Sequence, residues 1–165
     1  MVGKDLFRQV AGSFASGVTV ITTGRDDNYH GMTASSFSSL SLDPPLILVC
    51  FDLTAATLAA VDANGAFVVN ILGSQQEQIS RQFASRGQHS LDDVAFDLGE
   101  LEIPIIRDSL AHFECRVARR HLEGDHVILV GEVIAGGVDV GDDPLLYYRG
   151  SYRKLEGLPD LQPVR

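Results

Sequence analysis

Residues 31–45 read Gly31-Met32-Thr33-Ala34-Ser35-Ser36-Phe37-Ser38-Ser39-Leu40-Ser41-Leu42-Asp43-Pro44-Pro45, the most distinctive stretch of this 165-residue chain. Residues 30–39 predict a β-strand that is unusually rich in Ser and Thr. The Pro-Pro pair predicts a break, because proline lacks the N–H that a β-ladder needs. The apolar residues 46–51 then predict a short strand that is buried on both faces.

The hydroxyl groups of this stretch suggest a binding site. A planar heteroaromatic ligand needs edge-on hydrogen bonds and close approach of the backbone, and small Ser and Thr side chains allow both. A Ser/Thr-rich edge strand without a ligand is the structural alternative. The residues alone leave both readings open.

The segments on either side of this stretch predict a mainly β protein. Apolar residues at helical spacing predict a helix over 5–14, a second helix runs from a Thr54 cap to about Ala63, and a third follows the Ser74-to-Glu77 capping box. Hydrophobic or alternating runs predict further strands at 18–23, 66–72, 110–117, 127–134, 145–148 and 151–153. Since no strand–helix–strand rhythm runs through the chain, we expect an antiparallel barrel with short helices packed on its outside.

Two segments do not fit this pattern. Residues 86–108 are polar and then proline-containing, and predict a long excursion over the surface. Residues 156–165 predict a C-terminal coil tail after one domain over 1–155. Within the strand at 110–117, the alternation places Glu114 on the outward-facing side.

Charge and composition exclude several kinds of partner. The chain has 13 basic and 22 acidic residues, a net charge of −9, so it lacks the basic surface that nucleic acids or anionic membranes require. No apolar run reaches the roughly 18 residues of a membrane span, and the first residues do not resemble a signal peptide, which predicts a cytoplasmic protein. The two cysteines, Cys50 and Cys115, lie in apolar segments and predict buried thiols rather than a disulfide or a metal site.

Familiar catalytic and nucleotide-binding motifs are missing from the sequence. It has no GxGxxG after a strand and no GxSxG elbow. Gly12 and Gly17 have P-loop spacing, but Val18-Thr19 stands where Lys-Ser or Lys-Thr is needed.

Two further segments carry candidate ligand chemistry. Residues 54–57 begin a helix, whose free N–H groups suit a phosphate, and Arg81 could add a positive charge; ordinary capping by Thr54 and a solvated arginine are the alternatives. His126 follows a Gly-Asp turn, and the run Pro144 to Tyr152 gathers Tyr and Arg side chains that could stack on an aromatic ligand or form core and rim.

Taken in order, these segments resemble the flavin reductase-like, FMN-binding split-barrel family, and within it the short-chain NAD(P)H:flavin oxidoreductases of two-component monooxygenases. The resemblance covers roughly residues 5–153. The matching pieces are GVTVITT at 17–23, GMTASSFSSLSLDPP at 31–45, FVVNIL at 67–72, RQFA at 81–84, GDH at 124–126, GEV at 131–133 and PLLYYRG at 144–150.

The resemblance implies a Greek-key split β-barrel, a homodimer, and FMN or FAD as cofactor with NADH or NADPH as electron donor. It implies that His126 is the catalytic residue beside the flavin ring, where nicotinamide stacks. The implied cofactor-binding residues are Met32, Thr33, Ala34, Ser35, Ser36, Cys50, Asp52, Leu53, Thr54, Thr57, Asn70, Arg81, Phe83 and Tyr148.

The implied function is reduction of flavin by NAD(P)H, with the reduced flavin diffusing to a separate oxygenase. Hydride transfer between two stacked rings needs positioning and exclusion of water rather than a strong acid or base, which agrees with the missing catalytic motifs. The alternatives are a self-contained split-barrel flavoenzyme acting on an organic substrate, and a flavin-binding module without turnover.

Overall fold

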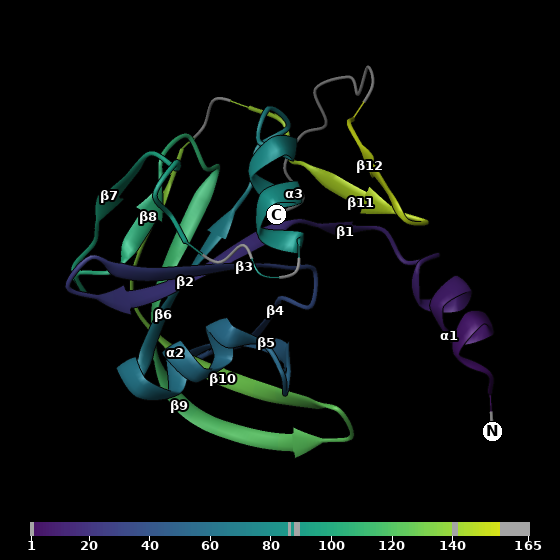
Figure 1. Cartoon of the computed structure of the whole chain (residues 1–165), viewed down its shortest axis with the longest axis horizontal. Helices are drawn as coiled ribbons and strands as arrows, with labels where there is room; N and C mark the ends of the chain where they lie inside the picture. The colour runs from purple at the N-terminus through teal and green to yellow at the C-terminus, as the bar shows by residue number, and fades with distance from the viewer. Residues whose placement is uncertain (1, 86, 88–89, 140–141, 156–165) are drawn as a thin grey trace.

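The computed structural model describes residues 2–85, 87, 90–139 and 142–155, and most of its regular structure is β (Figure 1). The main sheet has seven antiparallel strands in the spatial order β3 (Asn28–Ala34), β2 (Thr19–Arg25), β6 (Ala66–Ile71), β9 (Ala111–Glu123), β10 (His126–Val138), β5 (Pro45–Asp52) and β4 (Ser38–Leu42). Smaller sheets pair β1 (Ser16–Gly17), β11 (Leu146–Tyr148) and β12 (Ser151–Arg153), and pair β7 (Phe96–Leu98) with β8 (Pro104–Ile106). Three helices flank them: α1 (Lys4–Ala11), α2 (Ala56–Asn64) and α3 (Glu77–Ala84).

The main sheet is strongly curled, because its two edge strands are neighbours in the chain. Ala34 ends β3 and Ser38 begins β4, so at 3.8 Å per Cα–Cα step these ends lie at most about 15 Å apart. In a flat seven-stranded sheet with strands about 4.8 Å apart, the edges would be separated by about 29 Å. The predicted strand at 30–39 is therefore two strands, and the residues between them, 35–37, are the corner that joins the edges.

The core lies inside the curl and continues beneath α3. Alternate residues of β5, namely Ile47, Val49 and Phe51, are buried while Leu46, Leu48 and Cys50 are half-buried, so this strand is buried fully on one face and not on both as predicted. Phe67 of β6 and Leu129 of β10 complete this first cluster. A second cluster packs α3 and β11 against the sheet, through buried residues that include Val18, Leu72, Phe83 and Leu145.

The segment predicted as a surface excursion, 86–108, is partly built into the protein. It contains β7 and β8, and its side chains Leu91, Val94, Ile103 and Ile106 are buried. Glu114 holds it in place: this carboxylate is 2% exposed and accepts hydrogen bonds from the backbone N–H groups of Glu100 and Leu101. Glu114 therefore lies on the face opposite Cys115, as the alternation predicts, but residues 99–101 cover that face, so the side chain is buried and not exposed.

The starts of α2 and α3 also differ from the predicted caps. Ala55 occupies the N-cap of α2 without a side-chain bond, and the Thr54 hydroxyl donates instead to Asp52 Oδ1 at 2.6 Å. At α3 the N-cap residue is Gln76, and Ser74 bonds Asp142, so the capping box does not form. The predicted coil tail, 156–165, lies outside the described residues.

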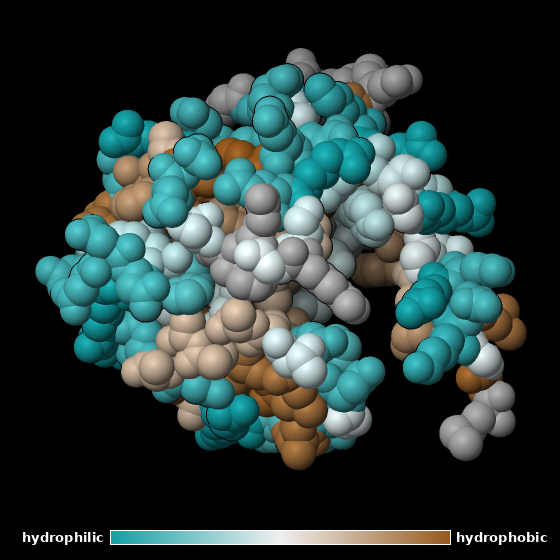
Figure 2. Space-filling view, viewed as in Figure 1, coloured by the Kyte–Doolittle hydropathy of each residue, from teal (hydrophilic) through white to brown (hydrophobic). Residues whose placement is uncertain are grey.

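Helix α1 and the distal end of the β9–β10 hairpin extend away from the core. Figure 1 shows α1 beside the body, and Figure 2 shows open space between them. Leu6, Phe7 and Val10 lie on one side of α1 at the predicted spacing, whereas Phe14 lies beyond the helix, which ends at Ala11 and not at residue 14 as predicted. All four side chains are more than half exposed. Strand β9 pairs with β6 only as far as Arg116, and its remaining residues pair with β10 alone among the described strands.

Gly131 gives a test of the packing inside the curl. A Cβ at this position would lie 2.7 Å from the Phe67 ring and 2.9 Å from Cys115 Cβ, so we expect Gly131→Ala to lower the free energy of unfolding by about 1–3 kcal/mol. Gly17→Ala is the matched control, since a Cβ there meets no atom within 4 Å and should change stability by less than about 0.5 kcal/mol. Urea unfolding of both variants measures the difference, and equal stabilities would contradict this description of the core.

Candidate functional site

Hydroxyl groups anchor the exit of β3, that is, its last residues and the residues 35–37 that follow it. Thr33 Oγ1 donates to the Ser80 carbonyl of α3 at 2.7 Å, and Thr19 Oγ1 donates to the Ala34 carbonyl at 2.8 Å. Ser36 Oγ donates to the Cys50 carbonyl and accepts from the Cys50 N–H. The chain is thereby fixed to β2, α3 and β5, while Ser35 between these anchors is exposed.

The end of β5 forms a compact corner beside this exit. Asp52 Oδ1 accepts from the N–H and the hydroxyl of Thr54, which makes a tight turn before α2. The Leu53 N–H donates to the Asp125 carbonyl at 3.1 Å. Because Ser36 already joins β5 at Cys50, the predicted residues from Thr33 to Ser36 and from Cys50 to Thr54 form one continuous region.

His126 lies at the same corner, at the first residue of β10 and directly opposite Asp52 in the register of the two strands. Its Nδ1 is 2.7 Å from Asp125 Oδ1, and its side chain is 47% exposed. The hydrogen bond and the charge of the imidazole lower the pKa of the Asp125 carboxyl below its ordinary value. The carboxylate fixes one edge of the ring, so Nε2 is the ring nitrogen that a ligand can contact.

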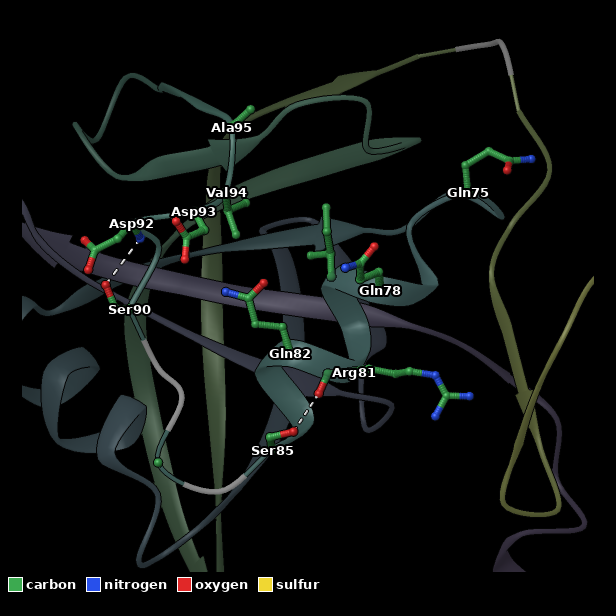
Figure 3. Close-up of a pocket in the computed structure, with 12 residues that line it drawn as sticks. Gln75, Gln78, Arg81, Gln82, Ser85, Ser90, Asp92, Asp93, Val94 and Ala95 are labelled. Carbon is green, nitrogen blue, oxygen red and sulfur yellow. Dashed lines mark hydrogen bonds between the residues drawn. The ribbon is translucent and has the colours of Figure 1, made fainter.

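Helix α3 provides the positive charge of the region. Arg81 is exposed, its Nη2 lies 2.7 Å from Glu77 Oε1, and its Cζ lies 4.7 Å from the centre of the Tyr152 ring. Figure 3 shows the outer face of this helix, with the side chain of Gln82 directed toward residues 90–93 and that of Arg81 directed away from them. A hollow of about 940 Å³ lies between α3 and residues 87–95.

Tyr148 and Tyr152 belong to the β11–β12 hairpin, which is a different part of the protein from the corner at His126. Tyr148 ends β11, and the guanidinium of Arg149 lies 5.2 Å from its ring. Arg149 and Gly150 both have positive φ, as a tight two-residue hairpin requires. The β11–β12 hairpin reaches α3 through Tyr152, whose hydroxyl is 2.7 Å from Ser80 Oγ.

Four of the predicted site residues are buried and have structural partners, and one of them, Ala34, lies in the first core cluster with its carbonyl bonded to Thr19. Thr57 is buried and donates to the Gly31 carbonyl, and Phe83 packs on Gly31, where a Cβ would lie 2.5 Å from the ring. Asn70 is buried and bonds Val20, Thr22 and Ile106 through its amide. These side chains support β3 and the core from behind, and Met32 packs partly buried against the same core.

Sequence reasoning did not single out Ser80, Asp125 or Tyr152 as site residues. Ser80 precedes Arg81 and is completely buried, so its position in the capping-box helix gave no sign of a contact with β3. Asp125 lay within the matched segment 124–126, where a carboxylate next to a histidine was the available signal, and Tyr152 lay in the run Pro144 to Tyr152 with its candidate stacking residues. Only the three-dimensional arrangement shows that Tyr152 reaches α3.

The described residues contain no group of three or more His, Cys, Asp or Glu side chains that could hold a metal ion, and none of the helices within them is long and apolar enough to cross a membrane. Both cysteines are free, and Cys50 is only half-buried, contrary to prediction. Burial raises the pKa of the Cys115 thiol to about 12, with the neighbouring charge of Glu114 adding to the shift. Cys115 is therefore protonated at neutral pH and is not a nucleophile.

Comparison with known proteins shows which family the chain resembles. The chain is 40% identical over 152 residues to the reductase subunit HsaB of a flavin-dependent monooxygenase from Mycobacterium tuberculosis, covering 91% of this chain and 81% of the relative. It is 40% identical over 159 residues to an NADH-dependent flavin reductase from a Rhodococcus species, covering 94% and 89%. The structure of the NADH:FAD oxidoreductase SgcE6 of Streptomyces globisporus, in complex with NAD and FAD fragments, superposes with a TM-score of 0.88 at 37% identity, covering 96% and 95% of the two chains.

Residues 11–156 match the family model described as flavin reductase like domain. The resemblance inferred from the segments between Gly17 and Gly150 is therefore confirmed, and so is the mainly β, antiparallel fold class with short flanking helices. The chain belongs to the flavin reductase-like family.

Proposed function

We propose that this protein is an NADH-dependent flavin reductase that passes reduced flavin to a separate monooxygenase. The observation that carries the proposal is the joining of two predicted flavin-binding segments, 33–36 and 50–54, by the bonds between Ser36 and Cys50, with His126 at the same corner. The relatives described above support the reaction and the choice of NADH.

The residues present fit a flavin. Ser35 exposes backbone and a hydroxyl beside two anchored neighbours, which suits the polar edge of an isoalloxazine ring. The Thr33–Ser80 bond holds α3 against β3 at the residue before Arg81. A phosphate on the ribityl chain of a flavin bound at β3 can therefore reach the Arg81 guanidinium. Of the predicted cofactor-binding residues, Arg81 lines the hollow beside α3, whereas residues 33–36, 50–54 and His126 lie outside its lining.

The protein's contribution to the reaction is positioning. A bound flavin supplies the acceptor for a hydride from the nicotinamide. The anchored exit of β3 holds its ring, and the His126 Nε2 edge, oriented by Asp125, contacts the nicotinamide or the reduced ring. Tyr148 closes the site from the β11–β12 hairpin.

The charge distribution favours exchange of the flavin over tight retention. Arg81 is one cation that is already paired with Glu77, and the chain carries a net charge of −9. A dianionic phosphate gains little at long range from such a protein. We therefore expect affinities near the micromolar range, about −8 kcal/mol.

The same proposal includes a homodimer of split barrels in the cytoplasm. The exposed apolar side of α1 supports the dimer, because an amphipathic helix is stable in water when its apolar side is covered. A second copy of the chain is the proposed cover. The curled sheet, with its edges joined at residues 35–37, supports the split barrel.

The reaction is tested with purified protein, NADH or NADPH, and FMN, FAD or riboflavin. We expect NADH oxidation only when flavin is present. In a second step, protein loaded with flavin is reduced by NADH without oxygen and desalted, and most of the reduced flavin should separate from the protein. No oxidation above background with any pair would contradict the proposal; stoichiometric retention of the flavin, with no reduction of excess free flavin, would favour a self-contained flavoenzyme.

His126→Ala should reduce the rate of flavin reduction more than flavin affinity. Loss of one positioning contact costs about 1–3 kcal/mol, which is roughly 5- to 150-fold in rate. The control is His121→Ala, an exposed histidine on the facing strand of the same hairpin. Stopped-flow reduction and flavin titration measure the two effects, and a normal rate with weakened flavin binding would refute this role.

The dimer is tested by placing charge on α1. Phe7→Glu combined with Val10→Glu adds two negative charges to the apolar side and should convert the dimer into monomers, as measured by light scattering. Arg8→Glu changes the charge by the same amount on the polar side and should leave the dimer intact. A monomeric wild type, or a double variant that remains dimeric, would exclude α1 as the dimer contact.

A further inference from the structure

Tyr152 contacts two elements that carry candidate ligand-binding residues, α3 and β11. Its hydroxyl lies 2.7 Å from Ser80 Oγ on α3, and its ring centre lies 4.7 Å from the Arg81 guanidinium carbon. It stands opposite Tyr147 of β11, with the two rings 5.3 Å apart at 66°. The half-buried ring also packs against the second core cluster, so its position is fixed from several sides.

Ser80 links this tyrosine to the exit of β3. The Ser80 carbonyl accepts the hydroxyl hydrogen of Thr33, while the Ser80 side chain bonds Tyr152. Ser80 is completely buried, so neither bond competes with bulk water. The β11–β12 hairpin, α3 and β3 are therefore joined through one residue.

Arg81 is held from two directions. Glu77 Oε1 contacts the Nε and Nη2 side of the guanidinium at 2.8 and 2.7 Å, and the Tyr152 ring lies against the group. An arginine has five N–H donors, so the Nη1 edge can face an anion while these contacts persist. An arginine held in this way has less rotamer freedom to lose when it binds a ligand.

A hollow of about 310 Å³ adjoins this arrangement, and Arg81 and Lys154 are among the residues that line it. Lys154 comes two residues after Tyr152, so the hairpin that supports Arg81 also supplies a second cation. The Glu77 carboxylate on the same wall is already paired with Arg81. An anionic group can therefore approach two cations at this place.

We propose that Tyr152 is a positioning residue, whose ring holds the Arg81 guanidinium ready for the phosphate of the flavin. The inference rests on the proposed function, in which Arg81 binds that phosphate. It assigns to Tyr152 the preference for phosphorylated flavins, and the packing of the ring against Tyr147 and the second core cluster holds it in place.

The test compares the affinities of FMN and riboflavin, which differ by the phosphate, in fluorescence titrations of the flavin-free protein. The measured quantity is the ratio of the riboflavin Kd to the FMN Kd. Tyr152→Met removes the ring and should lower this ratio by about 3- to 10-fold. Tyr152→Phe keeps the ring, which still packs against Tyr147 and the core, and should leave the ratio within about twofold.

The variant Arg81→Ala distinguishes two claims: that Arg81 binds the phosphate, which belongs to the proposed function, and that Tyr152 positions Arg81. The ratio should fall in Arg81→Ala, and adding Tyr152→Met to that variant should lower it no further, because the ring acts only through the arginine. If Arg81→Ala leaves the ratio unchanged, the proposed phosphate contact itself is wrong. If Arg81→Ala lowers the ratio but Tyr152→Met does not, or if the two effects add, the phosphate contact stands and the role of Tyr152 is wrong.

If Tyr152→Met does not fold, the same Kd ratio is measured with ring-fluorinated phenylalanine at position 152. Fluorination keeps the shape of the ring and weakens the negative face that attracts a cation. The ratio should then fall relative to Tyr152→Phe, while both proteins retain the same circular dichroism and the same riboflavin affinity. Equal ratios in the two proteins would overturn the proposal.

Discussion

The connection between Ala34 and Ser38 is the constraint on which the other features of the molecule depend. Because only three residues join the edge strands β3 and β4, the seven-stranded sheet has to curl until its edges meet. The curl encloses the first core cluster and places the exit of β3 against the end of β5. It also leaves the backbone at Ser35 exposed between anchored neighbours. The site is a consequence of how the sheet closes.

Much of the fold could be predicted from local sequence. Features that depend on contacts between residues far apart in the chain were predicted less well. Apolar spacing and alternation located the three helices and the main strands, since these signals depend on residues a few positions apart. The Ser/Thr-rich strand remains the predicted centre of the candidate site. Several of its hydroxyls nevertheless bond carbonyls of other elements, as Thr33 bonds Ser80. A sequence cannot distinguish a hydroxyl that contacts a ligand from one that anchors a strand.

Most of the errors have the same physical origin. Thr54 and Ser74 are good capping residues, but Thr54 bonds Asp52 in a local turn and Ser74 bonds Asp142, which is 68 residues away in the chain. Glu114 alternates like a surface residue, yet two N–H groups from a distant loop satisfy its carboxylate in the interior. That loop lacks a clear period because its apolar residues fill separate gaps in the core. Tyr152 gave no local sign of its contact with α3, 72 residues earlier in the chain.

The part of β9 that continues past β6 has a consequence for solubility. Beyond Arg116 one edge of this strand has no neighbouring strand among the described residues, and an uncovered edge is a template for association with another chain. Arg119 and Arg120 lie along it, two of the 13 basic residues of an acidic protein, and Asp62 pairs with Arg120. Two copies meeting edge to edge would bring these arginines together and would have to displace Asp62, so the extended hairpin resists aggregation even though its backbone is open.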